Sequence, residues 1–236
     1  MDEWQYRGAK DEDLPLEERL KSTRRETGLI GALSGLAWWA LVRAYMRVAH
    51  RLKSSDAQQL PDQPGFIIVA NHASHLDTLA IAATLPWRWN GHVFPVAAGD
   101  TFFDTPKTAR FAALCLNALP LWRRRAAGHA LKELRQRLEQ RQDVLILFPE
   151  GTRSRKGALG RFKPGIGRLV AGTAVPVVPA FIEGAHEAFP PHRKWPRPHP
   201  IRIRFGPSLN FADQPDERQG WEVIAERLEN AVRDLA

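Results

Sequence analysis

Short apolar runs alternate along this chain with segments of helical periodicity. Residues 66–70 (FIIVA) and 144–148 (VLILF) are continuous apolar stretches bounded by turn residues, which predicts two buried strands. Residues 92–98 predict a further strand, and residues 201–205 alternate apolar and basic positions with a period of two. Residues 175–182 are also predicted to be extended, and their prolines favour a place near a sheet edge.

Helical segments separate these strands. A helix is predicted at residues 74–85 and ends before Pro86, and residues 126–141 and 221–235 carry apolar stripes at helical spacing. Shorter helices are predicted at 108–119 and 166–171, with an extended piece at 120–122. Because strands and helices alternate and the strand runs are apolar throughout, the pattern predicts an α/β fold with a mostly parallel central sheet flanked by helices.

The N-terminal part follows a different pattern. Residues 1–27 are polar without periodicity and are predicted to form an arm. Residues 28–42 are apolar but shorter than the roughly 18 to 20 residues that a membrane-spanning helix needs, and a basic helix carrying arginines at 43, 47 and 51 follows. We predict a membrane-interacting two-helix segment at 28–56 and an α/β domain at 57–236. The alternative is a helical hairpin packed on the domain's own core.

Composition narrows the classes of partner. The chain of 236 residues has 34 Lys and Arg against 26 Asp and Glu, so its net charge of +8 favours an anionic partner. Scattered basic residues without a binding motif argue against nucleic acid. The single cysteine, Cys115, excludes an internal disulfide, and its apolar neighbours predict a packing role. Because no cleavable signal is evident in residues 1–27, we expect a cytoplasmic protein.

The first chemical cluster is the run NHASHLD at 71–77, directly after the strand at 66–70. His72 and Asp77 would lie about 140° apart on one regular helix, so they can pair only at a strand-to-helix corner. There the carboxylate can orient the imidazole, which could take a proton from a substrate hydroxyl.

Other readings of this cluster remain open. Ser74 and Asp77 also match a capping box, in which Asp77 only holds the start of the helix. Asn71 can be a turn residue. His72, His75 and Asp77 fit no common metal-site spacing, so no metal is expected.

The second cluster is FPEGTRS at 148–154, after the strand at 144–148. The carboxyl ends of strands in α/β proteins commonly hold ligands, Gly151 would let backbone approach a phosphate, and Arg153 could bind it with two hydrogen bonds. The basic residues that follow can equally be a solvated surface. The loop lacks the pattern of a nucleotide P-loop.

Together the two clusters resemble the motifs of the glycerolipid acyltransferase family, whose bacterial type member makes phosphatidic acid from 1-acylglycerol 3-phosphate. The resemblance covers roughly residues 66–205. The family motif His-x-x-x-x-Asp matches His72 and Asp77, and Phe-Pro-Glu-Gly-Thr-Arg-Ser is intact at 148–154. The resemblance implies that His72 is the general base and Asp77 its partner. It implies that the acceptor is bound by Glu150, Gly151, Thr152, Arg153 and, from a more weakly matched motif, Arg123.

The resemblance also implies the reaction and its setting. A fatty acyl group would move from acyl-CoA or acyl-carrier protein to a hydroxyl of a lysophospholipid such as 1-acylglycerol 3-phosphate, without a further cofactor. The enzyme would lie on the cytoplasmic face of the cell membrane, peripheral or monotopic, against an anionic membrane surface.

The sequence departs from the family at residues 97–103 (AAGDTFF), where many members carry a Lys followed by Glu-Leu. A different lysolipid or alcohol acceptor is therefore an alternative. Two rivals of another kind are a peripheral protein that binds anionic lipid without catalysis and a hydrolase that uses the same His and Asp on water.

Overall fold

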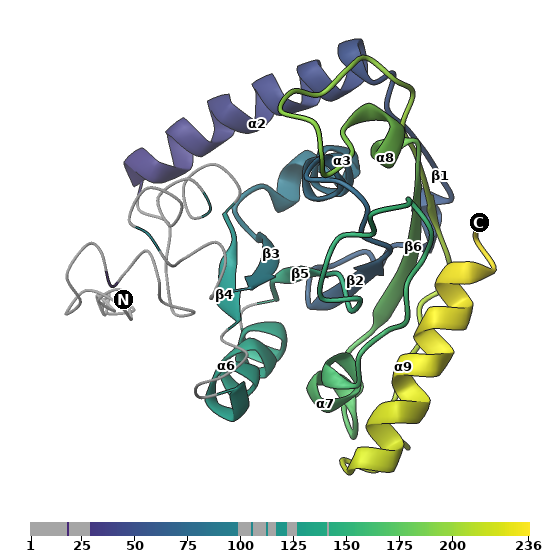
Figure 1. Ribbon diagram of the computed structural model, residues 1–236. Helices are drawn as coiled ribbons and strands as arrows, with labels where there is room; N and C mark the ends of the chain where they lie inside the picture. Colours follow the sequence, from purple (N-terminus) through teal and green to yellow (C-terminus); the bar gives the residue numbers. More distant parts are fainter. Residues whose placement is uncertain are drawn as a thin grey trace, which may run out of the picture.

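The computed structural model describes residues 29–98, 117–121, 127–140 and 142–236, together with Glu18, Thr105 and Ala112. A central sheet lies between two layers of helices (Figure 1). The strands are β1 (Lys53–Ser55), β2 (Phe66–Ala70), β3 (Val93–Ala98), β4 (Leu119–Leu121), β5 (Val144–Leu147), β6 (Val177–Glu183) and β7 (Arg202–Phe205). The helices are α2 (Leu29–Ala49), α3 (Leu76–Thr84), α6 (Ala127–Gln140), α7 (Gly165–Val170), α8 (Ala185–Ala188) and α9 (Arg218–Arg233), with short 3-10 turns at Ala57–Gln59 and Trp87–Trp89.

The sheet has the strand order β1-β7-β6-β2-β5-β3-β4. All its pairs are parallel except β6 with β7, which run antiparallel. The predicted α/β fold with a mostly parallel sheet is therefore confirmed. Strands β2 and β5 are central and buried at every position, because helices cover both faces of the sheet.

Alternate residues of the central strands feed two separate cores. Phe66 and Ile68 point to the face covered by α2 and α3, while Ile67 and Val69 point to the face covered by α6, α7 and α9. This split follows from the period of two along a strand. The apolar stripe predicted for the C-terminal helix is confirmed, since Ile224, Leu228 and Val232 of α9 are fully buried.

The expectation that residues 175–182 lie near a sheet edge is wrong. Strand β6 lies between β2 and β7. Pro179 is tolerated there because its nitrogen, which has no hydrogen to donate, faces β7 beyond the last residue pair of the β6–β7 ladder. Its carbonyl points the same way and accepts a hydrogen bond from Gly206 N.

The segment at 28–56 also differs from the prediction. The apolar stretch and the basic stripe, predicted as two helices, form the single helix α2, and Lys53–Ser55 form strand β1, which pairs with β7. Arg43 lies within this helix, donates to Leu85 O at 2.7 Å and lies over the Trp87 ring at 4.4 Å from its centroid. Among the described residues, the helices are all too short or too polar to cross a membrane.

Candidate active site

Two loops meet at the carboxyl ends of the central strands. Strands β2 and β5 are parallel neighbours with Val69 opposite Leu147, so the residues that follow them leave the sheet at the same edge. The 71–77 corner and the 148–154 loop are therefore brought together although they are far apart in sequence. Backbone contacts lock them, since Ser154 N donates to His72 O at 2.7 Å.

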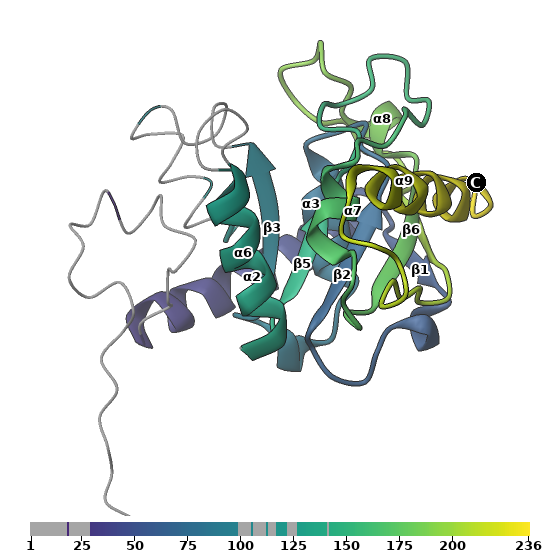
Figure 2. The same ribbon diagram turned by 90° about the horizontal axis from the view of Figure 1, so that it is seen from below.

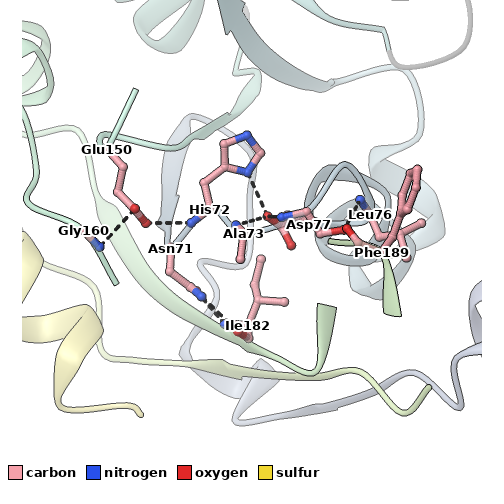
Figure 3. A network of polar contacts seen from close by, with 10 residues as sticks. Asn71, His72, Ala73, Leu76, Asp77, Glu150, Gly160, Ile182 and Phe189 are labelled. Carbon is pink, nitrogen blue, oxygen red and sulfur yellow. Dashed lines mark hydrogen bonds and ion pairs between the residues drawn. The ribbon is translucent and has the colours of Figure 1, made fainter. Parts of the chain in front are cut away.

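His72 and Asp77 form the pair that the sequence predicts. His72 Nδ1 lies 2.8 Å from Asp77 Oδ2, and the carboxylate is almost fully buried while about a fifth of the imidazole surface is exposed. Figure 3 shows the other ring nitrogen, Nε2, pointing away from this network. With Nδ1–H donating to Asp77, Nε2 carries the free lone pair that a general base needs.

Asp77 also holds the backbone of the corner. The same oxygen, Oδ2, accepts hydrogen bonds from Ala73 N and Ser74 N, each at 2.8 Å. Ser74 Oγ accepts from Leu76 N and donates to Phe189 O. The half of the capping box in which Asp77 reaches back to Ser74 N is thus present together with the His–Asp pair, so the two interpretations of Asp77 do not exclude each other.

The second oxygen of Asp77 has a different environment. Within the described part of the chain, Asp77 Oδ1 is buried without a hydrogen-bond partner. Because Oδ2 accepts all three hydrogen bonds, the carboxylate cannot rotate without losing them. The imidazole of His72 is consequently held in one orientation.

Glu150, which was expected to bind the acceptor, uses both of its carboxylate oxygens to hold backbone N–H groups. Its carboxylate is buried, with Oε1 accepting from His72 N at 2.8 Å and Oε2 accepting from Gly160 N at 3.0 Å (Figure 3). Burial raises the pKa of Glu150, against these two amide hydrogen bonds, which lower it. The side chain therefore braces the backbone of His72 and joins the corner to the end of the 148–160 loop.

Asn71 has a structural role beyond that of a turn residue. Its side chain donates to Ile182 O at 2.9 Å and accepts from Ile182 N at 2.8 Å. The Asn71 side-chain amide thus bonds to β6 as a backbone amide would, directly after the last β2–β6 pair, Ala70 with Ala180. The start of the corner is fixed to the sheet by this pair.

Gly151, Thr152 and Arg153 line the neighbouring loop. Gly151 has φ +73, and a Cβ there would lie 2.8 Å from Lys163 Nζ, so the glycine lets an ammonium group approach the backbone. Arg153 is partly exposed, and desolvation lowers its pKa against the pull of the Asp77 charge, while Thr152 is exposed. Lys163 and Arg153 give this loop the positive charge that would bind a phosphate.

The sequence predicted positive charge at Lys163 and a continuation of the family motif at 162–165, and it gave no role to Gly160. The run FKPG at 162–165 was the available signal for Lys163. Gly160 could not be recognised, because its importance lies in a contact: a Cβ there would lie 2.6 Å from Glu150 Oε2.

Two aromatic contacts complete the described site. The Phe148 ring stacks on the His72 imidazole, with centroids 4.2 Å apart and an angle of 18° between the planes. His75 lies beside Phe189, with centroids 5.9 Å apart. Partial desolvation, then the charges of Arg153 and His72, lower the pKa of His75 to about 4, so this side chain is neutral near pH 7.

Some predicted residues lie outside the described part of the chain. These are Arg123, Cys115 and most of the helix expected at 108–119. The structure therefore gives no position for Arg123 relative to Arg153.

The sequence matches the family model named Acyltransferase over residues 51–183, which is more than half of the chain. It is 38% identical over 88 residues to a 1-acyl-sn-glycerol-3-phosphate acyltransferase of Limnanthes douglasii, covering 37% of this chain and 31% of that protein. It is 32% identical over 132 residues to the alpha form from Ovis aries, covering 55% of this chain and 44% of that protein. This chain thus matches less than half the length of each of these relatives.

A solved structure resembles the fold. The crystal structure of the 1-acyl-sn-glycerophosphate (LPA) acyltransferase PlsC from Thermotoga maritima superposes with a TM-score of 0.64 at 21% identity, over 86% of this chain and 79% of that one. The family match spans both the 71–77 corner and the 148–154 loop. This chain belongs to the acyltransferase family.

Proposed function

We propose that this protein transfers a fatty acyl group from a thioester donor, acyl-CoA or acyl-carrier protein, to a hydroxyl of a lysophospholipid in phospholipid biosynthesis. The observation that carries the proposal is the His72–Asp77 pair, whose buried carboxylate fixes the ring while Nε2 is left free. The relatives named above are 1-acyl-sn-glycerol-3-phosphate acyltransferases, which supports 1-acylglycerol 3-phosphate as the acceptor. A different lysolipid or alcohol is the alternative acceptor.

The chemistry needs one base and a charged site for the acceptor. His72 Nε2 removes the proton of the acceptor hydroxyl as its oxygen forms a bond to the thioester carbonyl carbon. The tetrahedral intermediate collapses with cleavage of the carbon–sulfur bond, and the imidazolium of His72 returns the proton to the departing thiolate. Asp77 stabilises the imidazolium between these two steps. Because the thioester supplies the driving force, the proposal includes no metal or further cofactor.

The acceptor phosphate would be bound by the 148–163 loop. Arg153 and Lys163 supply two cationic groups, and Gly151 leaves room for the Lys163 ammonium group beside the backbone. Arg123 remains proposed as a further phosphate ligand, and exposed Thr152 as a hydroxyl donor. We assign Glu150 to bracing His72 and the loop, because both its oxygens already accept backbone hydrogen bonds.

We further propose that α2 lies on an anionic membrane surface, on the cytoplasmic face where the acyl donor would be met. The helix buries Trp39, Val42 and Met46 against α3 and the sheet, whereas Leu41 and Val48 on the opposite side are 62% and 82% exposed. An apolar outer face beside arginines is the pattern of a helix that lies in a lipid interface. Nucleic acid is not among the proposed partners.

The function is tested by following the loss of thioester and the release of CoA thiol with and without 1-acylglycerol 3-phosphate, with mass spectrometry of the lipid product. We expect acceptor-dependent release and a new diacyl lipid, both lost in His72→Ala. Thioester loss that is equal without acceptor would identify a hydrolase. Lipid binding without any thioester loss would identify a non-catalytic lipid-binding protein. Either result would overturn the proposal.

A further inference from the structure

The loop between α8 and β7, residues 190–200, is used neither by the fold's core nor by the chemistry proposed above. Its sequence is PPHRKWPRPHP, and no acidic residue occurs between 188 and 212. Trp195 is 80% exposed, and the basic residues Arg193, Lys194 and Arg197 beside it are exposed as well. A tryptophan exposed to this extent among cations is unusual, because tryptophan side chains are highly buried on average.

The loop is anchored at both ends. At its start, Phe189 O accepts from Ser74 Oγ, and the Phe189 ring lies against His75. At its end, His199 O is hydrogen-bonded to His50 Nδ1 at 3.2 Å, and Ile201 N donates to His50 O. One end is thus attached to the 71–77 corner and the other to the end of α2.

The body of the loop is restrained too. Arg197 N donates to Ala188 O at 2.8 Å, and Arg197 Nε donates to Glu187 O at 2.7 Å. Five of the eleven residues are prolines, which limit the backbone. Trp195 is therefore displayed on a stiff support, so its exposure is built into the fold.

The loop lies on the side of the molecule from which substrates would reach His72. Figure 2 shows it projecting beyond the carboxyl ends of the strands, together with the 148–160 loop. The two are linked by α8, since His186 Nε2 lies 3.2 Å from Arg155 O.

We propose that the 190–200 loop is a second lipid-contact surface, in which Trp195 enters the interface of an anionic bilayer and Arg193 and Lys194 bind its headgroups. Exposed tryptophan with adjacent cations is typical of side chains at the level of lipid headgroups, where the ring is partly apolar and the positive charge meets phosphate. The proposal rests on the membrane-bound acceptor proposed above, and it gives the bilayer a contact next to the corner that holds His72. Charge alone would also suit an acidic protein such as a carrier protein, but the apolar ring favours lipid.

The test is co-sedimentation with vesicles of phosphatidylglycerol and phosphatidylcholine, compared with phosphatidylcholine alone. We expect Arg193→Ala/Lys194→Ala to weaken partitioning to the anionic vesicles roughly 25-fold, at about fivefold for each basic residue. Trp195→Ala should weaken it by about tenfold or more on both kinds of vesicle, and Trp195→Phe should restore part of the loss. The matched control is Arg218→Ala/Arg227→Ala on α9, which removes the same charge from an exposed part of another face and should bind as the wild type does.

The outcomes separate this inference from the proposed function. His72→Ala protein should bind vesicles like the wild type, so a failure of catalysis leaves the binding test intact. Equal losses in the α9 control and the loop variant would show that only net charge matters and would overturn the inference. Unchanged vesicle binding together with weaker binding of acyl-carrier protein by the loop variant would assign the surface to an acidic protein instead.

Discussion

Replacing Asp77 by Asn tests whether this residue does more than cap α3. Asp77 Oδ2 accepts three hydrogen bonds at 2.8 Å, from His72 Nδ1, Ala73 N and Ser74 N. A hydrogen bond to a charged acceptor is worth about 1 kcal/mol more than one to a neutral acceptor, so the two backbone bonds alone lose about 2 kcal/mol.

The rate should fall further than the stability loss explains. Without the carboxylate, the imidazole loses both its orienting partner and the charge that stabilises its protonated form, so we expect turnover to drop by about 10²- to 10⁴-fold. Turnover is measured from thiol release, and the free energy of unfolding from urea titration, at a temperature at which the variant is folded by near-ultraviolet circular dichroism.

Ser74→Ala is the matched control for this experiment. It removes the bonds of Ser74 Oγ to Leu76 N and Phe189 O, which costs about 1 to 2 kcal/mol, and leaves the His72–Asp77 pair in place. Its turnover should stay within about tenfold of wild type. If Asp77→Asn lost no more activity than Ser74→Ala, Asp77 would be a cap only, and the orienting role would have to be abandoned.

Three further predictions concern the groups around this pair. Glu150→Gln replaces one carboxylate oxygen by an amide NH2 group, which cannot accept a hydrogen bond from the backbone. We expect kcat to fall by about ten- to hundredfold and the free energy of unfolding by about 1 to 2 kcal/mol. An effect confined to the KM for the lysophospholipid would instead make Glu150 a substrate ligand. Gly160→Ala should lower the free energy of unfolding, measured by urea titration, by about 1 to 3 kcal/mol, because its Cβ would lie 2.6 Å from Glu150 Oε2. Gly165→Ala, which has open space around its Cβ, should not lower it, and equal effects would contradict the crowding argument. Burial lowers the pKa of His50, so the unfolded chain binds the extra proton and stability should be lost as the pH falls below about 6.5, as measured by urea titration between pH 7.5 and 5. That slope should become shallower in His50→Phe without disappearing, because the lowered pKa of His75 contributes in the same direction, and an unchanged slope would assign it to His75 and other groups.

Much of the fold could be predicted because its central strands are simple apolar runs. Strand β2 matches the predicted residues, and β5 ends one residue earlier than predicted. The exposed β1 has the sequence KSS, which carries no hydrophobic signal, so only its long-range pairing with β7 makes it a strand. Likewise, the contacts of Arg43 with Leu85 and Trp87 join α2 to the segment that follows α3, which a local pattern cannot reveal.

The site was predictable as a set of residues but only partly as a set of contacts. The spacing of His72 and Asp77 required a strand-to-helix corner, and the structure has one. The partner of Glu150 could not be foreseen, since a loop carboxylate reads the same in sequence whether it binds a ligand or the backbone of a residue 78 positions away. Lys163 beside Gly151 is a similar case, because the approach depends on how the loop folds back.

Both backbone polar groups of His72 are bound by the 148–154 loop, its N–H by Glu150 and its carbonyl by Ser154 N. The position of the His72 backbone therefore depends on both loops together. A chimera that takes the 66–77 segment from a relative should keep a working base only if residues 148–160 come from the same parent. Libraries that aim to change acceptor choice are better varied outside these two segments, because a change inside either one moves the base as well as the binding surface.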